Sequence, residues 1–188
     1  MKPAEIFKIF RSSGALLDGH FILRSGLHSR QFFQCALVLQ HAPLAAKLCG
    51  ELAKKIDDEA IDTIISPAIG GIIVGQEIAR IIGKRHIFVE KEDGKLVLRR
   101  GFSIVRGERF LVAEDVVTQG GRVKEAIDIV RAHGGIVTAV AVLVDRSTAE
   151  LSLGTALHSL VKMPVETFSP AEIPADLKDV PAVKPGSK

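Results

Sequence analysis

The strongest constraint on the fold is an alternation of short apolar runs with amphipathic helical segments. The runs at 61–65, 110–113 and 136–144 have the composition of strands buried on both faces. Segments 72–82 and 122–133 carry apolar residues at helical spacing, and each ends at a glycine or soon before one. Because strands and crossover helices of this length form βαβ units, the sequence predicts an α/β fold with a doubly wound, mostly parallel sheet.

Other segments add elements around this sheet. Residues 3–10 read as an amphipathic helix, and 20–39 as two extended runs joined by a Ser-Gly turn. A further helix is expected over 42–58, with a proline in its first turn. The stretch 86–102 predicts a β-hairpin that projects from the sheet. After Ser147 the prolines leave only an irregular segment.

Length and composition describe an ordinary globular chain. With 188 residues, 47% of them hydrophobic and 25% charged, it fits one domain or one domain with a small lobe. The chain has no run of ~18 apolar residues that could cross a membrane, so no membrane partner is expected. The start, MKPAEIFKIFRSSG, lacks the apolar core of a secretory signal. We therefore expect a cytoplasmic protein.

Charge and metal-ligating residues exclude two further classes. A formal charge of +3 is not concentrated in a stripe of basic and aromatic residues, so no nucleic-acid partner is expected, whereas small anionic substrates are compatible. Cys35 and Cys49 have no metal-ligand spacing and read as buried thiols. The six histidines show no metal spacing either, and we assign no metal to them.

The most informative stretch is FLVAEDVVTQGGRV, residues 110–123. An apolar strand delivers Glu114 and Asp115 at its carboxyl end, where open α/β sheets bind ligands. The turn 118–121 then precedes a helix, and its backbone amides can hold a phosphate at the helix N-terminus. Like charges would repel a phosphate placed on the acids, so we expect the carboxylates to face neutral hydroxyls, such as a ribose diol. A structural turn with solvated acids is the plainer alternative.

This stretch resembles the 5-phosphoribosyl-1-pyrophosphate (PRPP) signature of type I phosphoribosyltransferases. The resemblance implies that the acidic pair holds the ribose hydroxyls and that the turn holds the 5-phosphate. It also places Asp115 among the catalytic residues. The implied PRPP contacts in this stretch are Glu114, Asp115, Val116, Val117, Thr118, Gln119, Gly120, Gly121 and Arg122.

Further segments resemble the orotate phosphoribosyltransferases within this family. FILRSGLHSRQFF, SPAIGG, FVEKEDGKLVLRRGF and LVDRS occur in that family's order and spacing, and the resemblance runs from about Phe21 to Ser147. It is closest to the shorter bacterial form. The resemblance implies transfer of the 5-phosphoribosyl group from PRPP to orotate, which gives orotidine 5′-monophosphate and pyrophosphate.

The resemblance also assigns the two ends of the substrates. It implies that pyrophosphate binds to backbone amides of Ala68, Ile69, Gly70 and Gly71. The family often has a basic or aromatic side chain in this loop, which Ile69 and Gly70 do not provide. Arg146 follows a buried strand, and an arginine is suited to bidentate capture of the carboxylate of orotate. A salt bridge from Arg146 to Asp145 or Glu150 is its plainer alternative. The other implied orotate contacts are Arg24, Phe32, Phe33 and Thr118, with Phe33 favoured as the core member of the aromatic pair.

The predicted hairpin carries Lys91 and Lys95 at its turn. Lysines on a turn are normally solvated, but the family uses this loop as a cationic lid over the departing pyrophosphate. This loop is short and has no His, so we favour Lys91, then Lys95, as the catalytic cation. The family also implies Mg²⁺ held mainly by substrate oxygens and water, with no metal ligand from the protein, and a homodimer that shares the lid between subunits.

The resemblance implies a single phosphoribosyltransferase domain over 1–188. Its core would span about 42–147, a small hood would come from about 1–41 and 148–175, and the tail 176–188 would be frayed. Three alternatives stay open: a phosphoribosyltransferase for a purine base, a PRPP-sensing regulator that releases no pyrophosphate, and a purely structural α/β module.

Overall fold

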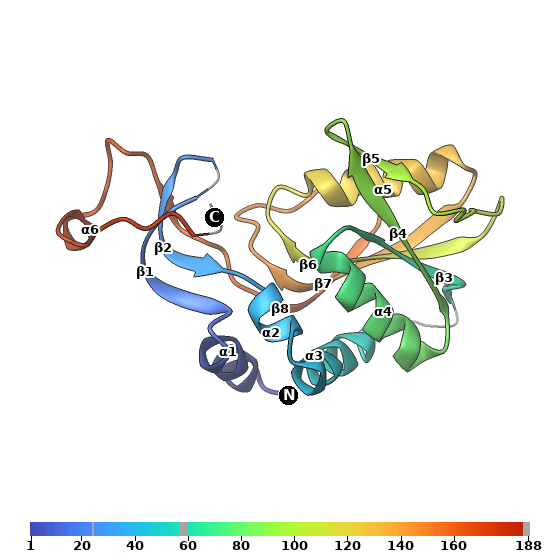
Figure 1. The fold of residues 1–188 in the computed structure, drawn as a ribbon, viewed down its shortest axis with the longest axis horizontal. Coiled ribbons are helices and arrows are strands. Elements are labelled where there is room, and N and C mark those ends of the chain that lie inside the picture. The colour runs from blue at the N-terminus through green and yellow to red at the C-terminus, as the bar shows by residue number, and fades with distance from the viewer. Residues whose placement is uncertain (24, 57–59, 186–188) are drawn as a thin grey trace. The chain divides into compact units, whose positions relative to one another are not determined.

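The computed structural model describes residues 1–23, 25–56 and 60–185, and the chain divides into two compact units. The larger unit is His41–Met163, which contains the parallel sheet, and the smaller one combines Met1–Gln40 with Pro164–Lys188 (Figure 1). Among the described residues, no helix is long and apolar enough to cross a membrane.

The larger unit is built on a six-stranded sheet in the order β5-β4-β3-β6-β7-β8. Every neighbouring pair is parallel except β4 and β5, which form an antiparallel hairpin at one edge. The predicted fold class is therefore confirmed. The strands are β3 (Thr63–Pro67), β4 (Arg85–Glu92), β5 (Lys95–Leu98), β6 (Arg109–Val117), β7 (Ile136–Asp145) and β8 (Ala156–Lys162).

Helices cover both faces of this sheet, as the apolar composition of its central strands requires. The helices α3 (Ala42–Ala53) and α4 (Gly70–Ile82) pack together on one face, where α4 lies against β3 and β6. The helix α5 (Gly121–Ala132) covers the other face (Figure 1). Its apolar side joins residues of β3, β4, β6 and β7 in one buried cluster, so the sheet is the middle layer of three.

The smaller unit is an antiparallel sheet of three strands in the order β1-β2-β9. Both ends of the chain contribute to it, because β9 comes from the C-terminal segment. Its elements are α1 (Pro3–Ser12), β1 (Leu16–Ile22), β2 (His28–Phe33), α2 (Ala36–Leu39), β9 (Thr167–Phe168) and α6 (Ala175–Lys178).

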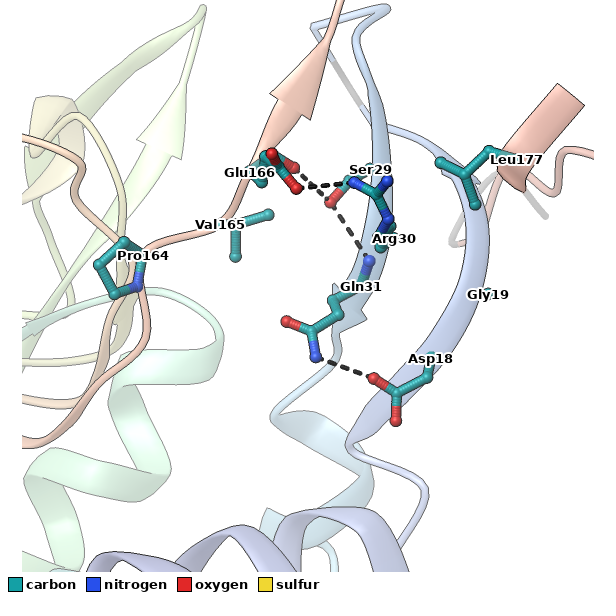
Figure 2. A pocket seen from close by; sticks show the side chains of 9 residues that line it. All are labelled: Asp18, Gly19, Ser29, Arg30, Gln31, Pro164, Val165, Glu166 and Leu177. Atoms are coloured by element: carbon teal, nitrogen blue, oxygen red, sulfur yellow. Dashed lines mark hydrogen bonds and ion pairs between the residues drawn. The ribbon is translucent and has the colours of Figure 1, made fainter. Parts of the chain in front are cut away.

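Side chains of β2 hold the C-terminal segment in this unit. Arg30 pairs with Glu166 at 2.7 Å and with Asp176 at 2.8 Å, and its guanidinium lies over the Phe168 ring. Of these residues, Arg30 and Glu166 line a cavity of about 460 Å³ (Figure 2). On its other side, Gln31 Nε2 donates to Asp18 at 2.8 Å. The polar groups of the cavity therefore bond to one another, and no predicted site residue lines it.

Several elements differ from those predicted. The helix α2 replaces the end of an expected extended run, because Cys35, Val38 and Leu39 are buried at helical rather than alternating spacing. The strand β8 lies in the segment expected to be irregular, and its mixed burial pattern explains why alternation did not mark it. The helix predicted over 42–58 ends at Ala53; of this range, 57 and 58 lie outside the described residues.

A close approach of α4 to the sheet depends on Gly75. A Cβ at this position would lie 2.5 Å from His86 Nε2 and still closer to Ser66 Oγ. These two groups are hydrogen-bonded at 3.1 Å, and burial lowers the pKa of His86 to about 4. A neutral imidazole therefore lies directly under the helix, with no room for a side chain above it.

We expect Gly75→Ala to lower the free energy of unfolding by about 1–3 kcal/mol, because the added methyl group overpacks this contact. Gly50→Ala on α3 is the matched control, since a Cβ there has no neighbour within 4 Å. Alanine should stabilise that helix by about 0.5–1 kcal/mol. Denaturant unfolding of both variants measures the difference, and a Gly75→Ala protein as stable as Gly50→Ala would contradict the packing described.

Candidate active site

The carboxyl end of β6 carries the acidic pair predicted from the sequence. Glu114 is buried and Asp115 is half-buried. The Asp115 N–H donates to Glu114 Oε1 at 3.1 Å, and the Val116 N–H donates to Asp115 Oδ1 at 2.8 Å. The strand continues to Val117. The acids and the two residues after them therefore belong to the strand, which is longer than the apolar run predicted at 110–113.

The start of α4 packs directly on this acidic pair. A Cβ on Gly71 would lie 2.9 Å from both the Ala113 carbonyl oxygen and Glu114 Oε1, and a Cβ on Gly70 would overlap the Asp115 carboxylate. Only glycine fits at both positions. The contact places the N-terminal end of α4, the positive end of its dipole, against the two carboxylates.

Burial is the main cause of the electrostatics of this pair. It raises the pKa of Glu114 to about 9, and the neighbouring charge of Asp115 acts in the same direction. Burial also raises the pKa of Asp115, against the lowering effect of its hydrogen bonds. Both acids therefore disfavour being charged together without a bound partner, which is a property typical of functional sites.

The turn after β6 presents backbone amides to solvent. Thr118 and Gln119 are exposed, and Gly120 has φ +76°, a left-handed conformation that glycine adopts without strain. A Cβ on Gly120 would also approach Leu153 Cδ2 to 3.3 Å. Within the described part of the chain, no side chain caps α5, whose first residues are Gly121 and Arg122. Its first amides are therefore available to an anion.

The loop after β3 lies at the same carboxyl edge. The Ala68 N–H donates to the Val89 carbonyl oxygen of β4 at 2.8 Å, and the Ala68–Ile69 peptide bond is cis. Ile69 is 80% exposed, so its side chain does not anchor the loop. Gly70 and Gly71, predicted to lie in this loop, form the first turn of α4. The structure thus brings the two predicted anion-binding segments to one edge of the sheet.

The hairpin carries the two predicted lysines on opposite faces. Lys91 pairs across the strands with Leu96, whereas Lys95 pairs with Glu92. Because directly opposed residues point to the same side of a hairpin, Lys91 shares the side of the buried Leu96, and Lys95 lies on the other side. Both lysines are exposed, and no hydrogen bond or ion pair of either side chain is found among the described residues.

The arginines that follow β5 brace the hairpin instead of extending it. Arg100 forms two hydrogen bonds to the Glu90 carboxylate at 2.7 and 2.8 Å, and Arg99 pairs with Glu92 at 2.8 Å. Arg100 lowers the pKa of Glu90 by these bonds. The negative charges of Glu90 and Glu92 are thereby balanced by arginines within the hairpin.

Arg146 is the first residue after β7, the strand next to β6. Its N–H donates to the Val117 carbonyl oxygen at 2.8 Å, so this residue is tied to the strand end that carries the acids. The carboxylate of Asp145 accepts the Ser147 N–H at 2.9 Å. Together these bonds hold the Arg146 backbone at the carboxyl edge.

The remaining predicted residues lie in the smaller unit or outside the described residues. Phe33 is buried and meets the Phe10 ring edge to face at 4.9 Å, so its predicted place in the core is confirmed. Phe32 is half-buried beside Phe21, with ring centroids 5.8 Å apart. Arg24 lies outside the described residues.

A strand end with paired carboxylates, followed by an uncapped glycine turn, is the site geometry of the phosphoribosyltransferase class. The family described as the phosphoribosyl transferase domain matches residues 38–156. Orotate phosphoribosyltransferases of Desulforamulus reducens and Pelotomaculum thermopropionicum are 49% and 50% identical to this chain. These matches cover all of this chain and 98% and 99% of theirs. The chain belongs to the orotate phosphoribosyltransferase family.

Solved structures agree with this assignment. The orotate phosphoribosyltransferase of Aeropyrum pernix matches with a TM-score of 0.72 at 25% identity, over 83% of this chain and 92% of its own. An adenine phosphoribosyltransferase of Thermoanaerobacter pseudethanolicus matches with a TM-score of 0.62 at 21% identity, over 71% of this chain and 88% of its own. The second likeness shows the fold alone.

We expect Glu114→Gln to stabilise the ligand-free protein at neutral and higher pH. The folded wild-type chain holds this proton up to a pH of about 9, whereas the unfolded chain releases it near the ordinary value of 4.5. Wild-type stability therefore falls as the pH rises between these values, and the neutral glutamine removes that loss. The gain at pH 8 should be at least about 2 kcal/mol, or roughly 4–8 °C or more in Tm.

Glu108→Gln is the control, because its effect on stability should have the opposite sign. Although burial works against it, hydrogen bonds from Thr63, the Val105 N–H and Arg85 lower the pKa of Glu108. Its contribution to stability is therefore present at neutral pH and is lost as the pH falls. Thermal melts from pH 4 to pH 8 in EDTA compare the variants. A Glu114→Gln protein no more stable than wild type at pH 8 would contradict the electrostatics assigned to the pair.

Proposed function

We propose that this chain transfers the 5-phosphoribosyl group of PRPP to orotate, giving orotidine 5′-monophosphate and pyrophosphate. The observation that carries the proposal is the carboxyl end of β6, where Glu114 and Asp115 precede an uncapped helix N-terminus. Full-length identity near 50% with curated orotate phosphoribosyltransferases supports the choice of substrates.

In this proposal the donor lies along the strand end and the turn after it. The 5-phosphate accepts hydrogen bonds from the backbone of Thr118 to Gly121, where the helix dipole of α5 favours a negative charge. The Glu114 and Asp115 carboxylates accept the ribose hydroxyls. Hydroxyl donors favour the charged form of these carboxyl groups and so offset the rise in pKa that burial causes.

The residues at this edge also fit Mg²⁺. Carboxylate oxygens are ligands that Mg²⁺ accepts, and it keeps several waters or substrate oxygens in its shell. Asp115 and Glu114 offer such oxygens, and no group of three or more metal-ligating side chains occurs in the part of the chain that the structure describes. When bound, the ion would neutralise charge on the pyrophosphate. We propose that substrate oxygens and water hold it mainly.

The protein then acts by positioning and by neutralising charge. Departure of pyrophosphate leaves an oxocarbenium-like ribose, so no protein nucleophile is required. The Ala68 N–H already donates to the Val89 carbonyl oxygen, so the amides of Ile69 to Gly71 hold the pyrophosphate end, beside the positive end of α4. Lys91 offsets the charge that grows on the leaving group, and the hairpin excludes water that would hydrolyse PRPP.

Arg146 is proposed to read the carboxylate of orotate. Its backbone is tied to Val117, so its guanidinium starts from the same edge as the donor site. A planar fork of donors matches a carboxylate with two parallel hydrogen bonds. The predicted orotate contacts of Thr118, Phe32, Phe33 and Arg24 stay predictions.

We further propose that the protein works in the cytoplasm as a homodimer whose hairpin lid serves the neighbouring subunit's site. The exposed lysines and the braced hairpin support a lid that extends from its own sheet. Gel filtration with light scattering distinguishes a dimer from a monomer.

Incubation with PRPP, Mg²⁺ and either orotate or adenine tests the proposed reaction. We expect loss of the orotate absorbance with matching release of pyrophosphate, and no product from adenine or hypoxanthine. A purine product would support the purine-base alternative. Binding of PRPP without pyrophosphate release would support a regulator that only senses PRPP.

We expect Lys91→Ala to lower kcat by roughly 10²–10³, the usual effect of losing one positioned donor to a developing anion. The KM for PRPP should change little, because the 5-phosphate and ribose contacts remain. Lys95→Ala is the matched control on the opposite face of the hairpin and should have a smaller effect. Steady-state kinetics measures both, and an unchanged kcat in Lys91→Ala would remove this lysine from the mechanism.

A further inference from the structure

An edge strand leaves a row of backbone amides without a strand partner, and in β5 one of these amides is bonded to a helix instead. The Leu96 N–H donates to Glu125 Oε2 at 3.1 Å. Glu125 lies in the second turn of α5, the helix that follows the phosphate turn. One exposed carboxylate thus joins the hairpin to that helix.

The side chain of Leu96 makes a second attachment at the same place. It is 9% exposed and belongs to the buried cluster that includes Val123, Ala126 and Ile127 of α5. The hydrogen bond restrains the strand along its length, whereas the apolar contact restrains its distance from the helix. Together they fix the position of Leu96 on α5.

The position of Leu96 determines that of Lys91, because the two residues face each other across the strands. The hairpin itself is tight: Asp93 has φ 47° and Gly94 φ 88°, as in a two-residue type I′ turn. The Glu90–Arg100 and Glu92–Arg99 pairs brace the same hairpin. Movement of Leu96 would therefore carry Lys91 with it.

We propose that Glu125 is a positioning residue, which anchors the β4–β5 hairpin to α5 and so holds Lys91 in register with the phosphate turn. The proposal rests on the function proposed above. It explains how one helix serves two sites. The N-terminus of α5 binds the 5-phosphate of its own subunit's donor, and its second turn holds the hairpin whose Lys91 meets the pyrophosphate in the neighbouring subunit. Glu125 itself touches no substrate.

Glu125→Ala and Glu125→Gln test this role, with Asp128→Ala as the control. Asp128 is an exposed acid on the same helix, so its loss changes the charge of α5 equally without touching the hairpin. Glutamine retains a side-chain oxygen that can accept the Leu96 N–H. Two readouts are needed: hydrogen exchange at the Leu96 amide, and kcat and KM for PRPP.

We expect Glu125→Ala to speed exchange at Leu96 at least about tenfold while the amides of β6 keep their wild-type protection. It should lower kcat about fivefold to tenfold, the size of one ordinary lost hydrogen bond, with KM for PRPP within about twofold. Glu125→Gln should restore most of both, and Asp128→Ala should match wild type.

Unchanged exchange at Leu96 in Glu125→Ala would overturn the anchor, whatever the activity. Faster exchange with wild-type kcat would overturn its role in catalysis, as would an equal loss of kcat in Asp128→Ala. Wild-type protein that makes no product from orotate and PRPP would instead overturn the proposed function, while the exchange measurement would still decide whether Glu125 anchors the hairpin.

Discussion

The contact between the start of α4 and the acidic pair of β6 is the constraint on which the rest of the site depends. Gly70 and Gly71 have no side chains, and this absence allows a helix N-terminus to lie against two buried carboxylates. Because β3 and β6 are parallel neighbours, the loop after β3 and the turn after β6 share an edge, and this approach brings the start of α4 against the acids between them. In the proposed function, the contact determines how close the two ends of the donor lie to the carboxylates.

This arrangement opposes stability in the free protein. Burial raises the pKa values of Glu114 and Asp115, so ionising this pair destabilises the folded chain. Ribose hydroxyls and a cation would stabilise the charged pair. The donor would thus bind at a place where the ligand-free protein is destabilised, which is a common trade-off between stability and function.

Positive charge at this edge of the sheet comes from two sources, the helix N-termini and the hairpin. The N-termini of α4 and α5 offer amides at one edge of the sheet, and they do so without moving a side chain. The lysine of the hairpin is different, since its location depends on how β5 is held. The hydrogen bond from Leu96 to Glu125 connects this lysine to the rigid part of the site.

Much of the fold was predictable because its signals are local. The apolar runs around Ile65, Val112 and Val140 are long enough to mark buried parallel strands. The strand β8 escaped prediction because a half-exposed edge strand has a weak pattern. Parts of the site were predictable for the same reason. The acids and the glycine turn are adjacent in the sequence, so one local motif identifies them.

Other parts of the site arise from contacts between distant segments, which no single stretch of sequence contains. The approach of Gly70 to Asp115 joins residues 45 positions apart. Glu125 reads as a solvated helix residue until β5 is seen beside it, and the distinction between Lys91 and Lys95 depends on the register of the hairpin. Long-range packing and register were therefore the information that the sequence lacked.

A crystal structure of the protein with PRPP and Mg²⁺ is the most direct measurement. We expect the 5-phosphate on the amides of Thr118 to Gly121, the ribose hydroxyls within hydrogen-bond reach of Glu114 and Asp115, and the pyrophosphate beside the start of α4. A donor bound elsewhere on the sheet, or a turn left empty at saturating PRPP, would contradict this placement of the donor.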